Sequence, residues 1–544
     1  MTGSECPRRE FLKVLASLSP AAVFDWDVFP RAGRQAAGAG SYDVVIIGAG
    51  LGGLSCGAAF ARQGFKPLVI EQHDKPGGYA TAFRRPGGFL FDVSLHSTGI
   101  GERNGVRNLI GGFPEITSIE FLQHPTLFRA VFPGHDVRVP QRDPQAFLKT
   151  LIGLFPEERD GITGLFDDMA GLGNEINRLG ASGGKVDMSR FATDFPLLAR
   201  CAGKTWGAMA DARIRDAKLK AIVSAQWWYY GLPPSKLSSF YYAIPFMGYL
   251  TVGGYYPRGR SQDISTALAA IVQQRGGTVL LNTRVEKIRV EGGRATGVVT
   301  AGGTEYAARA VVSNANPFDT LGKMVGEQAP VSEYQAKWQQ YSVSLSSFQV
   351  FLGLKEDLVG KLGLTDSEIF VETGYDPDAA YERARAGNVE DGAYLAALYD
   401  CIDRGYSPRR KNTINLLTLQ GYGPWERFEK DYDAGNKAEY RKEKERMAAA
   451  LIRRAEQSLL PGLSKAIEVK EIGTPLTNRR YTGHYRGAVY GWDQTPNNSG
   501  NTRVGHATPI KDLYMAGAWS RPGHGYGSVI GSGLECFAQI VKGW

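Results

Sequence analysis

Cysteine is scarce in this sequence. The five cysteines among 544 residues are Cys6, Cys56, Cys201, Cys401 and Cys536. Their wide spacing matches neither a set of zinc ligands nor a C-x-x-C redox pair. We therefore expect no metal site, no disulfide framework and no dithiol relay.

Clustered charge is lacking as well. The formal net charge is +8, but the basic residues are scattered along the chain. We therefore expect no nucleic-acid partner, and peripheral contact with an anionic membrane surface explains the positive balance better. Residues 237–257 carry no charge and are long enough to span a bilayer. Pro245, three glycines and many tyrosines in that stretch argue against a membrane helix.

Residues 41–71 carry the pattern of a dinucleotide-binding unit. An apolar run at 42–47 predicts a buried strand, and the glycines that follow it match G-x-G-x-x-G. These glycines permit a tight turn, close approach of a pyrophosphate and close packing of the next helix, which we expect at 54–63. A second strand at 66–70 ends in Glu71, where an acid can hold a ribose hydroxyl.

Two further segments expose backbone through glycine. Gly77 and Gly78 open a turn soon after Glu71, and residues 89–93 then predict a strand that leads to His96. Near the end of the chain, a buried strand at 513–516 is followed by several glycines and a helix at 528–541. A nicotinamide fold has no need of the second glycine pair, whereas the longer FAD molecule extends past the first helix.

The glycine fingerprint, the segments DKPGG and FLFD, and the C-terminal stretch together resemble the FAD-dependent family of phytoene desaturases, carotenoid isomerases and retinol saturases. The segment FDVSLHSTG is more similar to the retinol saturase branch, where F-D-x-G-x-H is usual, than to the phytoene desaturases, although Ser94 stands where that pattern has glycine. The resemblance covers residues 41–544 and implies FAD as the cofactor. Its implied fold class is α/β, with a discontinuous Rossmann-type FAD-binding domain and a mixed-sheet plus helical substrate domain.

Domain boundaries follow from this resemblance and from the length, which exceeds one compact core. We expect a leader and linker at 1–40, the FAD-binding domain at 41–100, 255–315 and 505–544, and the substrate domain at 101–254 and 316–504. Helices are expected at 144–155, 162–179 and 437–460, and a sheet strand at 342–354. Residues 474–492 resemble a family signature that either lines the flavin side of the site or forms a hairpin.

Candidate site residues divide into three groups, namely cofactor-binding residues, proton donors and substrate-binding residues. Val285 is implied by the resemblance to lie beside the adenine end of FAD through its backbone, while Arg258 and Arg260 either form surface charge or reach the cofactor. Candidate proton donors near the flavin are His96, His524 and Tyr526. Expected cofactor-binding residues are Gly48, Gly50, Gly52, Gly53, Glu71, Gly77, Gly78, Val285, Gly517, Gly525, Gly527 and Ser528.

An aromatic-rich segment between residues 227 and 256 is either a domain core or the wall of a tunnel for a long apolar substrate, and both can hold at once. The substrate candidates are Trp227, Trp228, Tyr241, Phe246 and Tyr481.

These features favour an FAD-dependent oxidoreductase acting on an isoprenoid or polyene lipid. Hydride exchange between flavin and a chain carbon would serve desaturation, saturation or cis/trans isomerisation. The absence of a second nucleotide fingerprint indicates no dedicated NAD(P) site, so a quinone, oxygen or an external electron donor would set the redox state of the flavin. Two alternatives stay open: a flavin amine oxidase, and a non-enzymatic prenyl-lipid carrier like the guanine-nucleotide dissociation inhibitors.

The N-terminus resembles a twin-arginine export signal. Arg8 and Arg9 begin the sequence R-R-x-F-L-K, which precedes an apolar run at 14–24. We therefore expect export of the folded protein to the periplasm. Asp25 and Asp27 follow the apolar run directly, and the alternative is a cytoplasmic protein with peripheral membrane contact.

Overall fold

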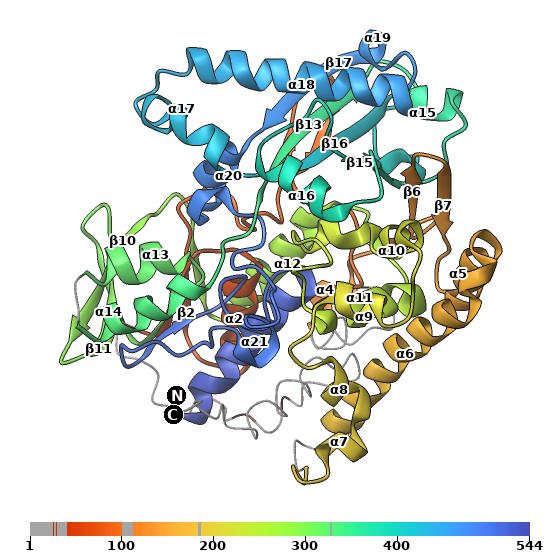
Figure 1. Ribbon diagram of the computed structural model, residues 1–544. Coiled ribbons are helices and arrows are strands. Elements are labelled where there is room, and N and C mark those ends of the chain that lie inside the picture. Colours follow the sequence, from red (N-terminus) through yellow and green to blue (C-terminus); the bar gives the residue numbers. More distant parts are fainter. Residues whose placement is uncertain (1–25, 27–28, 30–40, 101–112, 183–185, 327–328) are drawn as a thin grey trace.

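The computed structural model describes residues 26, 29, 41–100, 113–182, 186–326 and 329–544. Two large sheets and a group of helices make up this part of the chain (Figure 1). The expected twin-arginine signal lies outside the described residues. Among the helices that are described, none has both the length and the apolar character needed to cross a membrane.

The first sheet contains the glycine fingerprint. Its strand order is β10-β11-β12-β1-β2-β9, and β18 pairs with β12 on one side. Strands β9, β2, β1, β12 and β18 are parallel to their neighbours in this set, whereas β10 and β11 form an antiparallel extension. The bounds are β1 Ser41–Ile47, β2 Pro67–Ile70, β9 Thr278–Leu280, β10 Val285–Glu291, β11 Arg294–Thr300, β12 Glu305–Ser313 and β18 Leu513–Met515.

Strand β1 is apolar along its length because both of its faces are covered. Val44 and Ile46 pack toward one core, and Val45 and Ile47 pack toward another on the opposite face. The first of these cores includes residues of helices α2 (Leu51–Arg62), α12 (Ser261–Gln274) and α21 (Tyr526–Lys542). Figure 1 shows α2 and α21 side by side, so the two ends of the described chain meet at this sheet.

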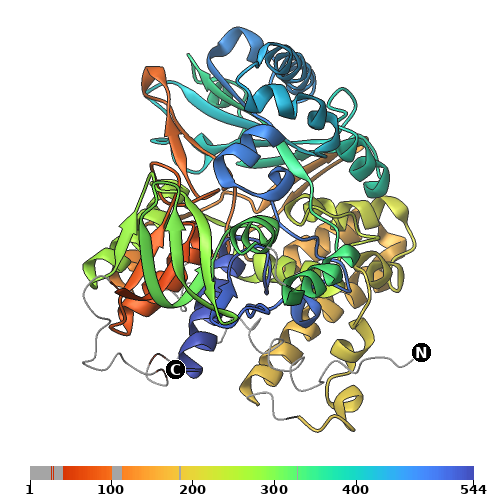
Figure 2. The same ribbon diagram turned by 90° about the vertical axis from the view of Figure 1, so that its left-hand side faces the viewer.

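The second sheet forms the opposite side of the molecule (Figure 2). Its order is β17-β13-β16-β15-β14-β6-β7, with β14 and β6 parallel and the other pairs antiparallel. Helix α18 (Ala438–Ser458) covers one face of this sheet. The strands are β6 Phe128–Phe132, β7 His135–Val139, β13 Ser346–Leu354, β14 Glu368–Val371, β15 Tyr394–Leu398, β16 Asn412–Gln420 and β17 Ile467–Gly473.

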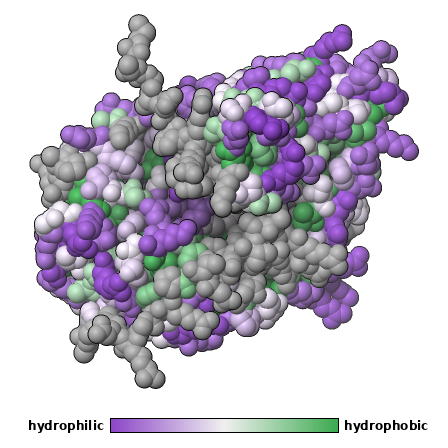
Figure 3. All heavy atoms as spheres, turned by 90° about the horizontal axis from the view of Figure 1, so that it is seen from below, coloured by the Kyte–Doolittle hydropathy of each residue, from purple (hydrophilic) through white to green (hydrophobic). Residues whose placement is uncertain are grey.

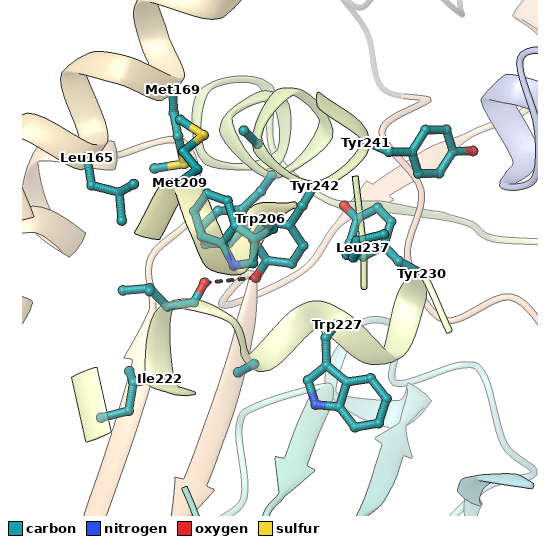
Figure 4. Packing of buried hydrophobic residues seen from close by; sticks show 14 of the residues in the cluster. Leu165, Met169, Trp206, Met209, Ile222, Trp227, Tyr230, Leu237, Tyr241 and Tyr242 are labelled. Atoms are coloured by element: carbon teal, nitrogen blue, oxygen red, sulfur yellow. Dashed lines mark hydrogen bonds between the residues drawn. The ribbon is translucent and has the colours of Figure 1, made fainter. Parts of the chain in front are cut away.

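A helical group packs beside both sheets. Trp206 stacks on Tyr242 at 4.4 Å between ring centroids, and the Tyr242 hydroxyl donates to the Val223 carbonyl (Figure 4). These rings hold the helices together through an apolar core. The main helices are α5 Pro144–Leu154, α6 Arg159–Ala181, α8 Pro196–Cys201, α9 Trp206–Asp211, α10 Ala217–Val223 and α11 Ser239–Val252, with the short helix η4 Ala225–Tyr229 between the last two.

Most of the expected elements are confirmed, including the helices near 144–155, 162–179 and 437–460 and the strand near 342–354. The hairpin alternative for residues 474–492 is wrong, because this segment forms helix α20 (Pro475–Thr482) instead. Pro475 at the first turn and the Thr474 side chain, which caps the backbone N–H of Thr477, account for that helix start. The strands of the first sheet come from the segments expected to bind FAD, while the exact domain boundaries stay a prediction.

Candidate functional site

A cavity of about 860 Å³ lies between the dinucleotide fingerprint and the second sheet. One half is lined by the turns after β1, β2 and β18 and by the start of α21. The other half is lined by η4, α11 and side chains from β13, β15 and β16. The volume falls in the range expected of a ligand-binding cavity.

Three glycine segments converge in the first half, hereafter the nucleotide half. The amide of Gly77 donates to the Ala49 carbonyl at 2.7 Å, which joins the second turn to the first. A Cβ atom built on Gly52 would lie 2.8 Å from the Cα atom of Gly517, so the third segment touches the fingerprint directly. Helix α21 begins after Gly525 at the same place. This backbone-lined cradle fits a pyrophosphate, because free amides at helix starts bind phosphate oxygens.

Glu71 supports the other end of the cradle. Its carboxylate accepts hydrogen bonds from the amides of Ala49 at 2.7 Å and His73 at 2.9 Å. Each carboxylate oxygen retains further acceptor capacity, so Glu71 can still receive a ribose hydroxyl. The expected cofactor residues that line the cavity are Gly48, Gly50, Gly52, Glu71, Gly77, Gly78, Val285, Gly517, Gly525, Gly527 and Ser528.

Gly53 has a different position. It does not line the cavity, and a Cβ atom there would lie 2.2 Å from the carbonyl oxygen of Gly48. The third glycine therefore allows α2 to pack against the turn, which is the mechanical role the motif assigns to it.

Asp92, the acid of the FLFD segment, fixes the chain before His96. It lies at the end of strand β4 (Leu90–Asp92) and is buried. Its carboxylate accepts hydrogen bonds from the Leu95 amide at 3.1 Å, the Tyr256 hydroxyl at 2.8 Å and the Ser261 amide at 2.8 Å. Asp92 thus ties the His96 turn to the start of α12 and does not line the cavity itself.

The two candidate histidines line the cavity and are neutral near pH 7. Burial lowers the pKa of His96 to about 4, and its Nδ1 atom is 3.2 Å from the Tyr399 hydroxyl. Burial, together with the positive charge of Arg503, holds the pKa of His524 well below its usual value. His524 lies between the rings of Tyr241 and Tyr490, at centroid distances of 5.1 and 4.3 Å.

Tyr526 is the third candidate proton donor. Its hydroxyl lies 3.1 Å from the Ser94 hydroxyl, and the residue lines the cavity at the start of α21. Burial raises the pKa of Tyr526 above its usual value, so it keeps its proton. Ser94, which replaces the glycine of the resembled pattern, therefore contacts a candidate donor. The structure places all three candidates on the cavity wall, and their catalytic roles stay predictions.

Helix α11 supplies one wall of the second half, hereafter the substrate half. Because residues three or four apart share a helix face, one stripe of α11 faces the cavity and the opposite stripe faces the core. Figure 4 shows the side chains of Tyr241 and Tyr242 pointing in different directions from α11. The stripe facing the cavity comprises Phe240, Tyr241, Ile244, Pro245, Gly248, Tyr249 and Val252.

The structure places the five expected substrate residues in three different surroundings. Trp228 and Tyr241 line the substrate half, but Trp227 and Phe246 are only 1% exposed and pack in the helical core. Phe246 is the residue after Pro245 in the helix, so its side chain is rotated by about 100° from that of Pro245 and points away from the cavity. Tyr481 lines the nucleotide half, where its ring lies tilted against that of His73 at a centroid distance of 5.0 Å.

The structure places Arg258 among surface charges, whereas Arg260 fits neither alternative because it is buried and does not line the cavity. Arg258 forms ion pairs with Glu120 and Asp403. The guanidinium of Arg260 lies 3.7 Å from the ring centroid of Tyr406 and is buried beneath it. Neither arginine lines the cavity.

Several wall residues were not anticipated. The Asn314 side chain fills the space beside Gly50 and Gly52, since Cβ atoms built there would meet it at 2.7 and 2.6 Å. Two buried acids at strand β14 contact aromatic residues of η4: Glu368, in the strand, contacts the Tyr229 hydroxyl, and Glu372, directly after the strand, accepts from Trp228 Nε1 at 2.7 Å. The available signal for this pair was the position of the two acids on either side of the apolar run 369–371.

Comparison with known proteins gives consistent matches. A family model described as flavin containing amine oxidoreductase matches residues 51–540. Prolycopene isomerase of Arabidopsis thaliana is 27% identical over 526 residues, which cover 93% of this chain and 84% of that protein. All-trans-retinol 13,14-reductase of Danio rerio is 27% identical over 513 residues, covering 87% and 82% of the two chains.

Solved structures show the same fold. An oxidoreductase from Methanosarcina mazei superposes with a TM-score of 0.60 at 16% identity, covering 91% of this chain and 99% of the other. A putrescine oxidase superposes with a TM-score of 0.59 at 15% identity, covering 92% and 99%.

Proposed function

This chain belongs to the flavin containing amine oxidoreductase family and is an FAD-dependent oxidoreductase, and from that premise we propose that its substrate is an isoprenoid or polyene lipid. The observation that carries the proposal is the single cavity that joins the glycine cradle to the aromatic face of α11. Similarity to a prolycopene isomerase and an all-trans-retinol 13,14-reductase supports a polyene.

The chemistry divides between cofactor and protein. Bound FAD supplies hydride exchange with carbon, which serves desaturation, saturation or isomerisation of a double bond. The glycine cradle and Glu71 hold its phosphates and ribose, and the α11 face excludes water and aligns an extended chain. Tyr526 retains a proton at the cavity wall and is the candidate donor where the reaction needs one.

An amine substrate is disfavoured by the wall chemistry. Among the described lining residues from η4, α11 and the second sheet, no side chain carries a charge near pH 7. An ammonium group there would lose its hydration without gaining an ionised partner. The likeness to putrescine oxidase therefore supports the fold and not the substrate.

The decisive experiment uses the flavin-loaded protein. Prolycopene and all-trans-retinol are incubated with it without oxygen, once with oxidised and once with reduced flavin. We expect a change in the polyene absorption spectrum and a new chromatographic product in one of the two states. Peroxide release from amines in air, together with no change in any polyene, would favour the amine oxidase alternative.

We further propose that a quinone, oxygen or an external donor exchanges electrons with the flavin. The basis is the single G-x-G-x-x-G in the sequence. A stoichiometric, tightly bound nicotinamide in the purified protein would contradict this proposal.

We also propose export by the twin-arginine route, on the basis of Arg8 and Arg9. Replacing both by lysine should retain the protein in the cytoplasm, as measured by fractionation.

Peripheral membrane contact is a separate proposal. On the face shown in Figure 3, the coloured hydrophobic residues form separate patches between hydrophilic ones, so such contact would combine charge with small apolar areas. Co-sedimentation with anionic vesicles would test it.

A further inference from the structure

Four buried polar atoms without a hydrogen-bond partner among the described residues belong to side chains that line the cavity or lie near residues that do. They are His96 Nε2, Ser97 Oγ, His124 Nε2 and Glu368 Oε1. His124 Nδ1 lies 2.7 Å from the hydroxyl of Ser367, the residue before Glu368, and Ser97 directly follows His96. Buried polar atoms normally have partners, so such a concentration points to a polar group supplied from outside the chain.

Two tyrosines present this polar region to the cavity. Tyr229 and Tyr249 both line the substrate half, from η4 and α11 respectively. The Tyr229 hydroxyl is hydrogen-bonded to Oε2 of Glu368, which is 1% exposed. The Tyr249 hydroxyl donates to the Ser97 carbonyl at 3.4 Å. Burial and, after it, the negative charge that Glu368 carries when ionised raise the pKa of both phenols, so the three groups are neighbours.

The hydrogen of Tyr229 is used within this cluster. The Tyr229 hydroxyl donates to Oε2 of Glu368, so the phenol oxygen retains a lone pair as an acceptor at the cavity wall. Oε1 of Glu368 has no partner among the described residues.

Tyr249 offers the same function. Its hydrogen is directed to the Ser97 carbonyl, so its oxygen retains a lone pair as an acceptor. The wall thus provides two acceptors, the phenol oxygens of Tyr229 and Tyr249.

We propose that Tyr229, Tyr249 and the Glu368 behind them form a subsite that binds a hydroxyl group of the substrate. This inference rests on the proposed function and narrows its substrate class to polyene alcohols. A hydroxyl can donate to one of these phenol oxygens, whereas a carbonyl or an ether oxygen has no hydrogen to donate. A carboxylate would meet no cation, because no lysine or arginine lines this half among the described residues.

The test is a comparison of binding to the oxidised, flavin-loaded protein. Two ligand pairs are used: all-trans-retinol with its methyl ether, and a hydroxylated carotenoid with the corresponding hydrocarbon carotene. Dissociation constants follow from the change in polyene absorption on titration. In the wild type, we expect the alcohol of at least one pair to bind about tenfold more tightly than its partner, the effect of one well-formed hydrogen bond.

Variants test whether the preference for the alcohol comes from this subsite. Tyr229→Phe should weaken binding of the alcohol about tenfold and leave binding of the ether or hydrocarbon unchanged. Tyr242→Phe is the matched control, because Tyr242 is fully buried, does not line the cavity, and its hydroxyl donates to the Val223 carbonyl. This control should retain the full preference for the alcohol.

The outcomes separate the two proposals. Equal binding of alcohol and partner in the wild type, or an unchanged preference in Tyr229→Phe, would overturn the subsite while the polyene function stands. If no member of either pair binds, the proposed function fails and the subsite fails with it.

Discussion

The two halves of the cavity are built in different ways. The nucleotide half is mainly backbone, supplied by three glycine turns that approach one another closely. The substrate half consists of side chains from η4, α11 and the second sheet, backed by buried acids. A site made of closely packed backbone has almost no room for added side-chain atoms. In a site made of side chains, each substitution can change the shape and polarity of the wall. This difference fits the proposed roles, in which the first half would hold the cofactor and the second half would select the substrate.

The sharpest test of this difference is Gly52→Ala. The added methyl group would meet the Cα atom of Gly517 at 2.8 Å, and backbone at that distance cannot move aside cheaply. We expect loss of most of the bound flavin, measured by absorbance of the purified protein, with secondary structure retained. Gly173→Ala on α6 is the control, because nothing lies within 4 Å of its Cβ position. Full flavin content in Gly52→Ala would show that the cradle is looser than described.

Two substitutions on α11 compare its core face with its cavity face. Phe246→Ala removes a ring from the helical core and should lower the free energy of unfolding by about 3–5 kcal/mol. Ile244→Ala removes atoms that face the cavity, where fewer contacts are lost, and should cost clearly less. Denaturant unfolding of both variants measures the difference. Equal losses would mean that the cavity face is packed as tightly as the core.

The buried acid Glu368 makes stability depend on pH. Burial raises its folded pKa to about 8, compared with about 4.3 for an unfolded glutamate. Between these values the folded state holds a proton that the unfolded state has lost, so the free energy of unfolding falls as pH rises and levels off above pH 8. The loss is on the order of a few kcal/mol.

Glu368→Gln has no ionisable group at this position, so its free energy of unfolding should fall less than that of the wild type as the pH rises. Relative to the wild type, the variant should gain stability between pH 5 and pH 8, as measured by thermal unfolding at both pH values. The same change at exposed Glu439 should leave the pH dependence of stability as it is in the wild type. An identical pH dependence in Glu368→Gln and wild type would show that the buried carboxyl is ionised throughout.

The sequence predicts these halves unequally, for a physical reason. Gly48, Gly50 and Glu71 lie within one local unit whose spacing specifies strand, turn, helix and acid. The two tryptophans at 227 and 228 looked equivalent in sequence, and only the direction of η4 separates core from cavity wall. Tyr229 and Glu368 are 139 residues apart, and their contact depends on how the helical group packs on the second sheet.

Arg260→Lys should have the smallest effect of these substitutions. From the sequence alone, this residue could either form surface charge or reach the cofactor. Its guanidinium packs 3.7 Å from the Tyr406 ring centroid and donates to the Tyr406 carbonyl. Lysine keeps the charge but loses the planar stacking, so we expect stability to fall by about 1 kcal/mol. Flavin content should not change, because Arg260 does not line the cavity. Loss of flavin in this variant would extend the cofactor site beyond the backbone cradle and weaken the contrast between the two halves.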